Sequence, residues 1–174
     1  MKTVIERPAE GRMDHRTDAT RVESTSKTTT VFTNGCFDLF HAGHVLFLSR
    51  CRVLGDRLVV GLNTDDSVRR LKGPTRPICT FAERSQVLLG CRYVDEVFGF
   101  DEPTPCRLIR QLRPEIIVKG PGYSIANMPE VAVVEEYGGR VVLVDGPPIS
   151  STEIIARILS ISGRRNVAPE MARA

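Results

Sequence analysis

The stretch VFTNGCFDLFHAGH, residues 31–44, decides the fold of this chain. It starts in a short β-rich segment, Thr29–Thr33, passes through a turn and continues into a helical pattern over Gly43–Leu54. A strand that leads directly into a helix is the first half of a βαβ unit. If this order recurs along the chain, the strands pair in parallel and each helix crosses back over the sheet.

The order does recur. Further strands are predicted over 58–62, 94–98, 115–118 and 140–144, and further helices over 81–91, 105–112, 129–137 and 151–160. The strands are nearly continuous apolar runs, as in sheets that are covered on both faces. We therefore predict an α/β fold, a Rossmann-like three-layer sandwich with a five-stranded parallel sheet. Ligands bind such sheets beyond the carboxyl ends of the strands, so the loops that follow the strands are the candidate site.

The predicted domain spans residues 28–162 and lies between two polar ends. Residues 1–27 are expected to be a flexible N-terminal tail and residues 163–174 a C-terminal tail. The formal net charge of the chain is +3. Because the two ends carry +1 and +2, the domain itself is neutral. The basic character therefore belongs to the ends and does not indicate a nucleic-acid surface.

Composition also excludes several classes of protein. No apolar run approaches the roughly 18–20 residues of a spanning helix, and the N-terminus lacks the apolar stretch of a secretory signal. The five cysteines are an odd number without a C-x-x-C pair, which argues against a disulfide framework or a structural zinc site. We expect a cytoplasmic protein that binds neither membrane nor nucleic acid.

The first loop contains two of the three histidines of the chain, three residues apart, where a strand turns into a helix. Unpaired N–H groups and the helix dipole bind anions at such a position. His41 and His44 would share a helical face, and Gly43 lets a ligand approach the backbone. From spacing alone, the histidines could instead cap or fill a turn, while a metal site lacks a third ligand. Phe37 and Phe40 are expected to pack in the core and loop.

The same loop resembles a known signature. Its residues Gly35-x-Phe37-Asp38-x-x-His41-x-Gly43-His44 match the HxGH motif of the cytidylyltransferase-like nucleotidylyltransferases, in register and between a strand and a helix. Four further stretches, NTDDSxxRLKGxxRP, TPxRLI, VKG and STxII, are similar to the heptose-1-phosphate adenylyltransferase domain that usually follows a sugar kinase in bifunctional enzymes. The similarity covers roughly residues 28–160.

The resemblance implies a reaction. NMP, expected to be AMP from ATP, is transferred to a sugar 1-phosphate such as D-glycero-D-manno-heptose 1-phosphate, with release of pyrophosphate. The attacking phosphate is already an anion, so catalysis rests on positioning and charge stabilisation. Mg²⁺ would bridge phosphates and need few protein ligands. The alternatives are a cytidylyltransferase that acts on a polyol phosphate or phosphonate, and a nucleotide-binding module without turnover.

The resemblance also implies residue roles. The expected catalytic residues, which hold the α-phosphate, are His41, His44 and Lys72. The expected nucleotide- and phosphate-binding residues are Thr33, Asn34, Gly35, Phe37, Asp38, Gly43, Arg76, Lys119, Gly120, Ser150, Ser151 and Thr152. The expected substrate-binding residues are Asn63, Asp65 and Tyr123, and no residue is expected to bind a metal. Arg84 would help Arg76 to order the site.

Some of these assignments have structural alternatives. We interpret residues 63–80 as one long loop in which Arg69 and Arg70 are solvated. Arg84 could orient its helix through a salt bridge, and the hydroxyls of residues 150–152 could cap the last helix, with Ser150 as the main cap.

Two positions depart from the families' patterns. Gly122 stands where the V-K-G loop of the adenylyltransferases usually has an acidic residue before Tyr123, which bears on substrate identity. Asp145 stands where the glycerol-phosphate cytidylyltransferases usually have Arg, which argues against that subfamily. Apolar helix faces with few aromatic residues are compatible with a homodimer, which we expect.

Overall fold

The computed structural model describes residues 4–6, 28–146 and 149–165. Its centre is a parallel sheet of five strands in the order β4-β3-β2-β5-β6. The strands are β2 (Thr30–Gly35), β3 (Arg57–Asn63), β4 (Glu96–Phe100), β5 (Ile116–Lys119) and β6 (Arg140–Leu143). The predicted α/β, Rossmann-like fold is confirmed.

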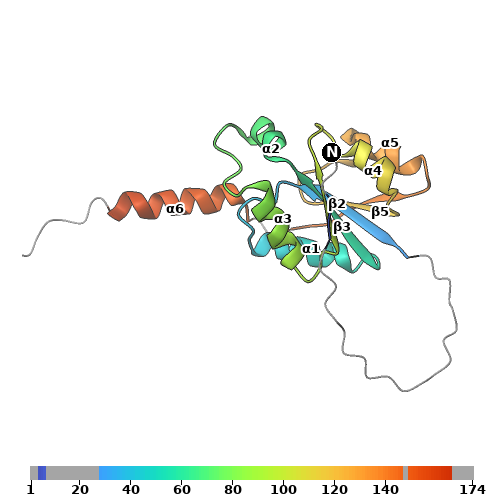
Figure 1. The fold of residues 1–174 in the computed structure, drawn as a ribbon, viewed down its shortest axis with the longest axis horizontal. Helices are drawn as coiled ribbons and strands as arrows, with labels where there is room; N and C mark the ends of the chain where they lie inside the picture. The colour runs from blue at the N-terminus through green and yellow to red at the C-terminus, as the bar shows by residue number, and fades with distance from the viewer. Residues whose placement is uncertain (1–3, 7–27, 147–148, 166–174) are drawn as a thin grey trace, which may run out of the picture.

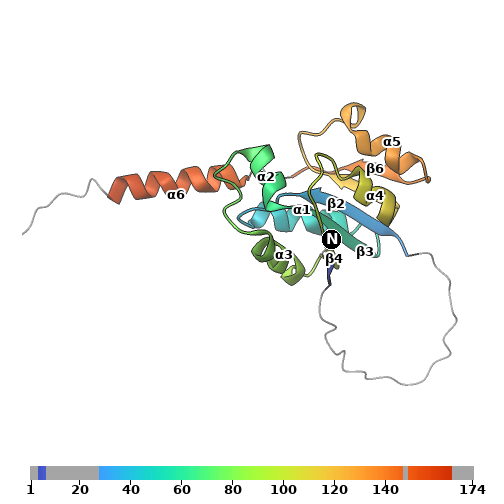
Figure 2. The ribbon, with the colours of Figure 1, turned by 45° about the horizontal axis from the view of Figure 1, so that its top comes forward.

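Helices cover both faces of the sheet, and their order along the chain follows the predicted alternation. They are α1 (Ala42–Arg52), α2 (Asp65–Lys72), α3 (Phe81–Gly90), α4 (Cys106–Leu112), the 3-10 turn η1 (Ile125–Asn127), α5 (Pro129–Glu135) and α6 (Ser151–Arg165). In Figures 1 and 2, α1 and α3 lie on one side of the sheet and α4 and α5 on the other. The three layers are therefore helix, sheet and helix.

The core follows from the alternation of side chains along the strands. Val31 packs in a cluster with Leu48 of α1 and Leu88 of α3. Its neighbour Phe32 points to the opposite face and packs in a second cluster, which also holds residues of α4 and α5. Successive strand residues face opposite sides, so an apolar run is buried on both faces. This explains the near-continuous apolar strands of the sequence.

A sixth strand lies in the segment predicted to be an N-terminal tail. β1 (Val4–Glu6) pairs antiparallel with β4 at the edge of the sheet. The parallel five-stranded prediction thus describes β2–β6 and omits this edge strand, since three residues carry no periodicity. The rest of the two predicted tails, residues 1–3, 7–27 and 166–174, lies outside the described residues.

The interpretation of residues 63–80 as one long loop is wrong, because α2 occupies its first half. Thr64 caps this helix by accepting a hydrogen bond from the Ser67 N–H, and two acidic residues lie in the first turn. Gly73 ends it with φ of 99°. Caps and charges of this kind favour a helix, but Val68 is the one buried apolar side chain of α2, so an apolar stripe is nearly absent.

α6 leaves the body of the molecule as a single projecting helix (Figures 1 and 2). It runs three residues beyond the predicted domain end at 162. Its outer half exposes Ile158, Leu159 and Ile161. Neither this helix nor any other within the described ranges is long and apolar enough to cross a membrane.

Candidate functional site

A cavity of about 650 Å³ opens at the carboxyl ends of β2, β3 and β5, where the topology predicts a ligand site. It brings together most residues selected from the sequence. Those that line it are Asn34, Gly35, Phe37, Asp38, His41, Gly43, His44, Asn63, Lys72, Arg76, Lys119, Gly120, Tyr123, Ser150, Ser151 and Thr152. Thr33 and Asp65 are not among its lining residues.

The two histidines lie at the start of α1, with their rings stacked 3.8 Å apart between centroids. His41 is the N-cap, and its Nδ1 accepts a hydrogen bond from the Gly43 N–H at 3.1 Å. Because Nδ1 accepts, a neutral His41 carries its proton on Nε2 and can donate from there. The capping and anion-binding interpretations of His41 are therefore compatible: one nitrogen caps the helix while the other is a donor.

Both imidazoles are held in the neutral form. The pKa of His44 is lowered to about 4, mainly by burial. The nearby His41 also lowers this pKa, and Asp38 raises it by a smaller amount. Burial also lowers the pKa of His41. His44 packs beside the Phe37 and Phe40 rings, with centroids 5.1 and 5.5 Å away. The predicted packing role of these two aromatics thus fits, and each histidine presents one N–H donor near neutral pH.

The Asp38 carboxylate is committed to the architecture of the site. It is 1% exposed and accepts hydrogen bonds from the N–H groups of Ile78 and Cys79, both at 2.9 Å. It also pairs with Arg76 at 2.8 Å. Asp38 therefore fixes residues 76–79 against the first loop, and its carboxylate is engaged by protein groups rather than facing a ligand. Its own carbonyl accepts a hydrogen bond from Ser151, which joins the start of α6 to the same loop.

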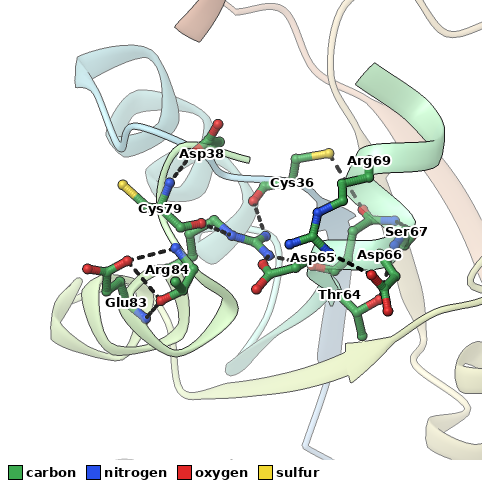
Figure 3. A network of polar contacts seen from close by, with 12 residues as sticks. Cys36, Asp38, Thr64, Asp65, Asp66, Ser67, Arg69, Cys79, Glu83 and Arg84 are labelled. Carbon is green, nitrogen blue, oxygen red and sulfur yellow. Dashed lines mark hydrogen bonds and ion pairs between the residues drawn. The ribbon is translucent and has the colours of Figure 1, made fainter. Parts of the chain in front are cut away.

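Arg84 ties three segments of the chain together (Figure 3). Its side chain is 1% exposed. It donates to the backbone carbonyls of Cys79 at 3.0 Å, Cys36 at 2.6 Å and Asn63 at 2.9 Å. It also pairs with Asp65 at 2.7 Å. The two interpretations of Arg84 both hold, because the same side chain forms a helix-orienting ion pair and orders the loops.

Two residues predicted to bind ligand have structural contacts instead. Asp65, at the start of α2, points toward Arg84 (Figure 3) and is not among the residues that line the cavity. Thr33 is fully buried, and its hydroxyl donates to the Val118 carbonyl at 2.9 Å. Thr33 precedes Asn34, which lines the cavity, and neighbouring strand residues face opposite ways. The motif matched both positions, but alternation allows only one of them to reach the ligand.

The last helix begins at the cavity. Ser150 and Glu153 form reciprocal hydrogen bonds, with Ser150 N–H to Glu153 at 2.9 Å and Glu153 N–H to the Ser150 hydroxyl at 3.2 Å. This is a capping box, so the predicted capping role of Ser150 is confirmed. Ser151 and Thr152 line the cavity beside the first loop, and the N–H groups of the first turn of α6 lie next to them.

Sequence reasoning missed Glu130, which lies in the first turn of α5 and lines the cavity. Its carboxylate is 2.7 Å from the Lys119 ammonium, and both side chains are almost completely buried. The Lys119 ammonium also donates to the Asn34 amide oxygen at 2.7 Å. No motif contains Glu130, although an acidic residue directly after Pro129 at a helix start is a local signal.

The remaining residues of the wall are mainly apolar or backbone groups that were not selected as site residues from the sequence. They include Cys36, Phe47, Leu71, Phe100, Pro103, Thr104, Pro105, Pro121, Asn127, Met128, Pro129, Gly146 and Ile149. Cys36 has a raised pKa, chiefly because it is buried, so this thiol is not an activated nucleophile.

The cavity lies at the edge of a parallel sheet and combines N–H donors at two helix starts with the side chains of Lys72 and Arg76. These are the features of an α/β domain that holds a polyanionic ligand. Comparison with known proteins identifies the family. Residues 32–157 match the cytidylyltransferase-like family, and the chain belongs to it.

Curated relatives share about half of their aligned residues with this chain. Bifunctional protein HldE from Syntrophotalea carbinolica is 51% identical over 143 residues, which are 82% of this chain and 29% of that protein. Bifunctional protein HldE from Geotalea uraniireducens is 52% identical over 141 residues, 79% of this chain and 28% of that protein. The chain therefore spans less than a third of the length of these relatives.

Solved structures share the fold. A lipopolysaccharide core biosynthesis protein from Thermoplasma volcanium has a TM-score of 0.58 at 26% identity, over 71% of this chain and 99% of that one. A protein of unknown function from Archaeoglobus fulgidus has a TM-score of 0.51 at 22% identity, over 67% of this chain and 88% of that one.

Proposed function

We propose that this domain transfers AMP from ATP to a sugar 1-phosphate, D-glycero-D-manno-heptose 1-phosphate, giving an ADP-sugar and pyrophosphate. The observation that carries the proposal is the stacked pair His41 and His44, two neutral N–H donors at a helix start that faces the hydroxyls of α6. The HldE relatives, with their 51–52% identity, support the choice of acceptor class.

The phosphates would lie between the starts of α1 and α6. His41 and His44 would donate to the α-phosphate, where negative charge develops during transfer, and Lys72 would approach it from the end of α2. Ser151, Thr152 and the first N–H groups of α6 would hold the rest of the triphosphate. Arg76, whose guanidinium pairs with the Asp38 carboxylate, lines the same part of the cavity and would add N–H donors there.

The acceptor would attack in line with the departing pyrophosphate. Its phosphate is an anion at neutral pH, so no protein group has to remove a proton. The low pKa of His44 fits this role, because a neutral imidazole donates without the repulsion that a charged pair His41–His44 would suffer. Catalysis then rests on orientation and on fixed donors.

The base and the sugar would occupy different parts of the cavity. Phe47, Pro121 and Ile149 with the backbone of Gly120 and Gly146 make an apolar slot near the start of α6, which suits a base recognised through backbone groups. Asn34, Asn63, Lys119, Tyr123 and Glu130 make a polar end, which suits a hydroxyl-rich acceptor.

Mg²⁺ would enter on the triphosphate. Asp38 and Glu130 are engaged by protein partners, and the described residues include no group of three or more His, Cys, Asp or Glu placed to hold a metal. This donor set fits an ion ligated mainly by phosphate oxygens and water. When bound, the ion would neutralise phosphate charge, while the residues above orient the phosphates.

We further propose a cytoplasmic homodimer. The odd number of cysteines without a C-x-x-C pair supports a reducing compartment. Exposed Ile158, Leu159 and Ile161 on α6 support association of two copies through this helix. Light scattering of Leu159→Glu should give a monomer where the unaltered chain gives a dimer; a dimer in both would exclude α6 as the interface.

Product analysis tests the proposed reaction. The chain is incubated with Mg²⁺, one of ATP, CTP or GTP, and heptose 1-phosphate or glycerol 3-phosphate, and pyrophosphate and nucleotide products are measured. ADP-heptose is the expected main product. CDP-glycerol would instead establish the polyol cytidylyltransferase. Tight ATP binding without pyrophosphate release on any acceptor would establish a non-catalytic nucleotide-binding module.

A further inference from the structure

The loop after β5 lacks the acidic residue that its sequence motif leads one to expect. Gly122 occupies that position with φ of 88°, a conformation that L side chains rarely adopt. No atom lies within 4 Å of the place where a Cβ would stand. The loop is therefore shaped for glycine, and an acidic side chain at residue 122 would need another backbone conformation.

A carboxylate nevertheless reaches this end of the cavity, from a different element. Glu130 comes from the first turn of α5 and is 5% exposed. Its Oε1 lies 2.7 Å from the Lys119 ammonium, which is also 2.7 Å from the Asn34 oxygen and 5.1 Å from the centre of the Tyr123 ring. The ammonium is therefore surrounded by a full negative charge, an amide dipole and an aromatic face.

The charges at this end of the cavity cancel. A buried ammonium without a counterion attracts a phosphate strongly, because water screens it little. With Glu130 beside it, the pair is neutral as seen by a ligand, and the carboxylate oxygens repel a second anion. The Glu130 charge also acts on Tyr123. Burial raises the pKa of the Tyr123 hydroxyl, and the negative charge of Glu130 raises it further.

A neutral ammonium–carboxylate pair suits hydroxyl groups, which can accept from Lys119 and donate to Glu130. The other end of the cavity differs. It contains Lys72 and two helix starts, and within the described part of the chain no carboxylate forms a salt bridge with Lys72. The two ends thus select for different chemistry, an anion at one and uncharged hydroxyls at the other.

We propose that Glu130 determines acceptor specificity: by neutralising Lys119 it admits the hydroxyl-bearing part of a sugar monophosphate and rejects a sugar that carries a second phosphate at its far end. This inference rests on the proposed function, because it assigns the polar end of the cavity to the acceptor.

Kinetics with two acceptors test it. The kcat/KM of the chain is measured with ATP and a sugar 1-phosphate, and with the same sugar bearing a second phosphate on its terminal carbon. The unaltered chain should prefer the monophosphate by about 10²-fold or more, as like-charge contacts cost several kcal/mol. In Glu130→Gln the amide oxygen still accepts a hydrogen bond from Lys119, but the positive charge of Lys119 is no longer neutralised. The preference for the monophosphate should therefore fall by at least about tenfold, while the KM for ATP stays within about twofold.

Glu136→Gln is the matched control. Glu136 follows the same helix but pairs with Arg110 on the exposed surface, so this variant should keep the preference for the monophosphate. If Glu130→Gln changed the kcat/KM for both acceptors and the KM for ATP by one common factor, Glu130 would be a structural residue and the inference would be wrong.

A double variant decides the matter if Glu130→Gln does not fold. Lys119→Met with Glu130→Met removes both charges, a change that buried pairs often tolerate. It should still reject the bisphosphate, but with the KM for the monophosphate raised about tenfold through lost hydrogen bonds. Ready use of the bisphosphate by this variant would overturn the inference. Absence of any nucleotide-sugar product from the unaltered chain would instead refute the proposed function, and the inference with it.

Discussion

The loops that follow β2 and β5 lie side by side at the carboxyl edge of the sheet but are built in opposite ways. The β2–α1 loop is fixed: Phe37 and Leu39 hold φ of 47° and 48°, and the carboxylate of Asp38 between them is fully engaged. The β5–α5 loop is open, and residues 121–127 are all exposed. It is attached to the cavity through Lys119 and Glu130.

This difference separates two tasks. In the proposed reaction, nucleotidyl transfer would need donors held in place to a fraction of an ångström, and the β2–α1 loop has that rigidity. Choice of acceptor would need a surface that can change without disturbing the chemistry, and the β5–α5 loop can change because few contacts restrain it. The departure at Gly122 falls in the loop that tolerates it.

The largest expected effect follows from removing a donor of the fixed loop. His44→Ala should lower kcat by about 10²–10³-fold, because an electrostatic donor that acts on the developing charge is lost. Far-UV circular dichroism should remain unchanged. Val45→Ala, at the exposed next residue, is the control and should keep its kcat. Near-normal turnover of purified His44→Ala would refute the mechanism.

The rigidity of the same loop has a structural source that can be removed. Arg84→Met should lower the free energy of unfolding by about 3 kcal/mol or more, since three buried or part-buried backbone carbonyls and a carboxylate lose their partner. Urea denaturation measures this. Arg69→Met breaks only an exposed pair with Asp66 and should cost less than about 0.5 kcal/mol. Equal losses in both variants would show that Arg84 does not support the frame.

The neutral state of His44 predicts a pH dependence of stability. Its pKa falls from 6.5 to about 4 on folding, so between these values the unfolded chain binds a proton that the folded chain does not. Stability contributed by His44 is therefore complete above pH 6.5 and is lost as the pH falls toward 4, by at most about 1.4 kcal/mol per pH unit.

The comparison that isolates this contribution is between the unaltered chain and His44→Asn. Unfolding free energies at pH 7, 6 and 5 should fall less steeply in the variant, because all other groups titrate in both. Parallel pH profiles would mean that His44 is not shifted in the folded state.

The smallest effect concerns the open loop. Gly122→Ala should destabilise the fold by about 1 kcal/mol, because alanine is strained at a positive φ. Gly90→Ala is a matched change in α3, with equally open space and without a positive φ, and should be neutral or stabilising by up to about 1 kcal/mol. The same sign for both in thermal melts would show that the conformation at residue 122 is not specific.

Most of the fold could be predicted, because parallel strands and crossover helices produce strong patterns. Apolar runs such as Leu58–Leu62 and helix signals such as the Thr80–Glu83 capping box are local. α2 was missed because its signals are a cap and charges rather than an apolar stripe. β1 was missed because three residues carry no periodicity, and its strand depends on the edge of β4.

The candidate site was predictable as far as its motifs reach. His41, Lys72 and Ser151 line one cavity although they are far apart in sequence. Motifs do not show the direction of side chains: the sequence predicts Thr33 and Asp65 in the site, whereas Thr33 is buried against Val118 and Asp65 pairs with Arg84. Glu130 could not be found, since its proximity to Lys119 arises only when α5 packs beside β5.

The contacts of Arg84 bear on how this family can diversify. Arg84 binds the carbonyls of Cys36, Asn63 and Cys79, and a main-chain carbonyl is supplied by any amino acid. Mutation can therefore replace the side chains of these three positions during evolution while the arginine continues to hold the loops in register. As far as these contacts are concerned, the cavity-wall side chains can therefore vary. The amino acid at position 84 has to remain arginine, because its side chain makes all three hydrogen bonds.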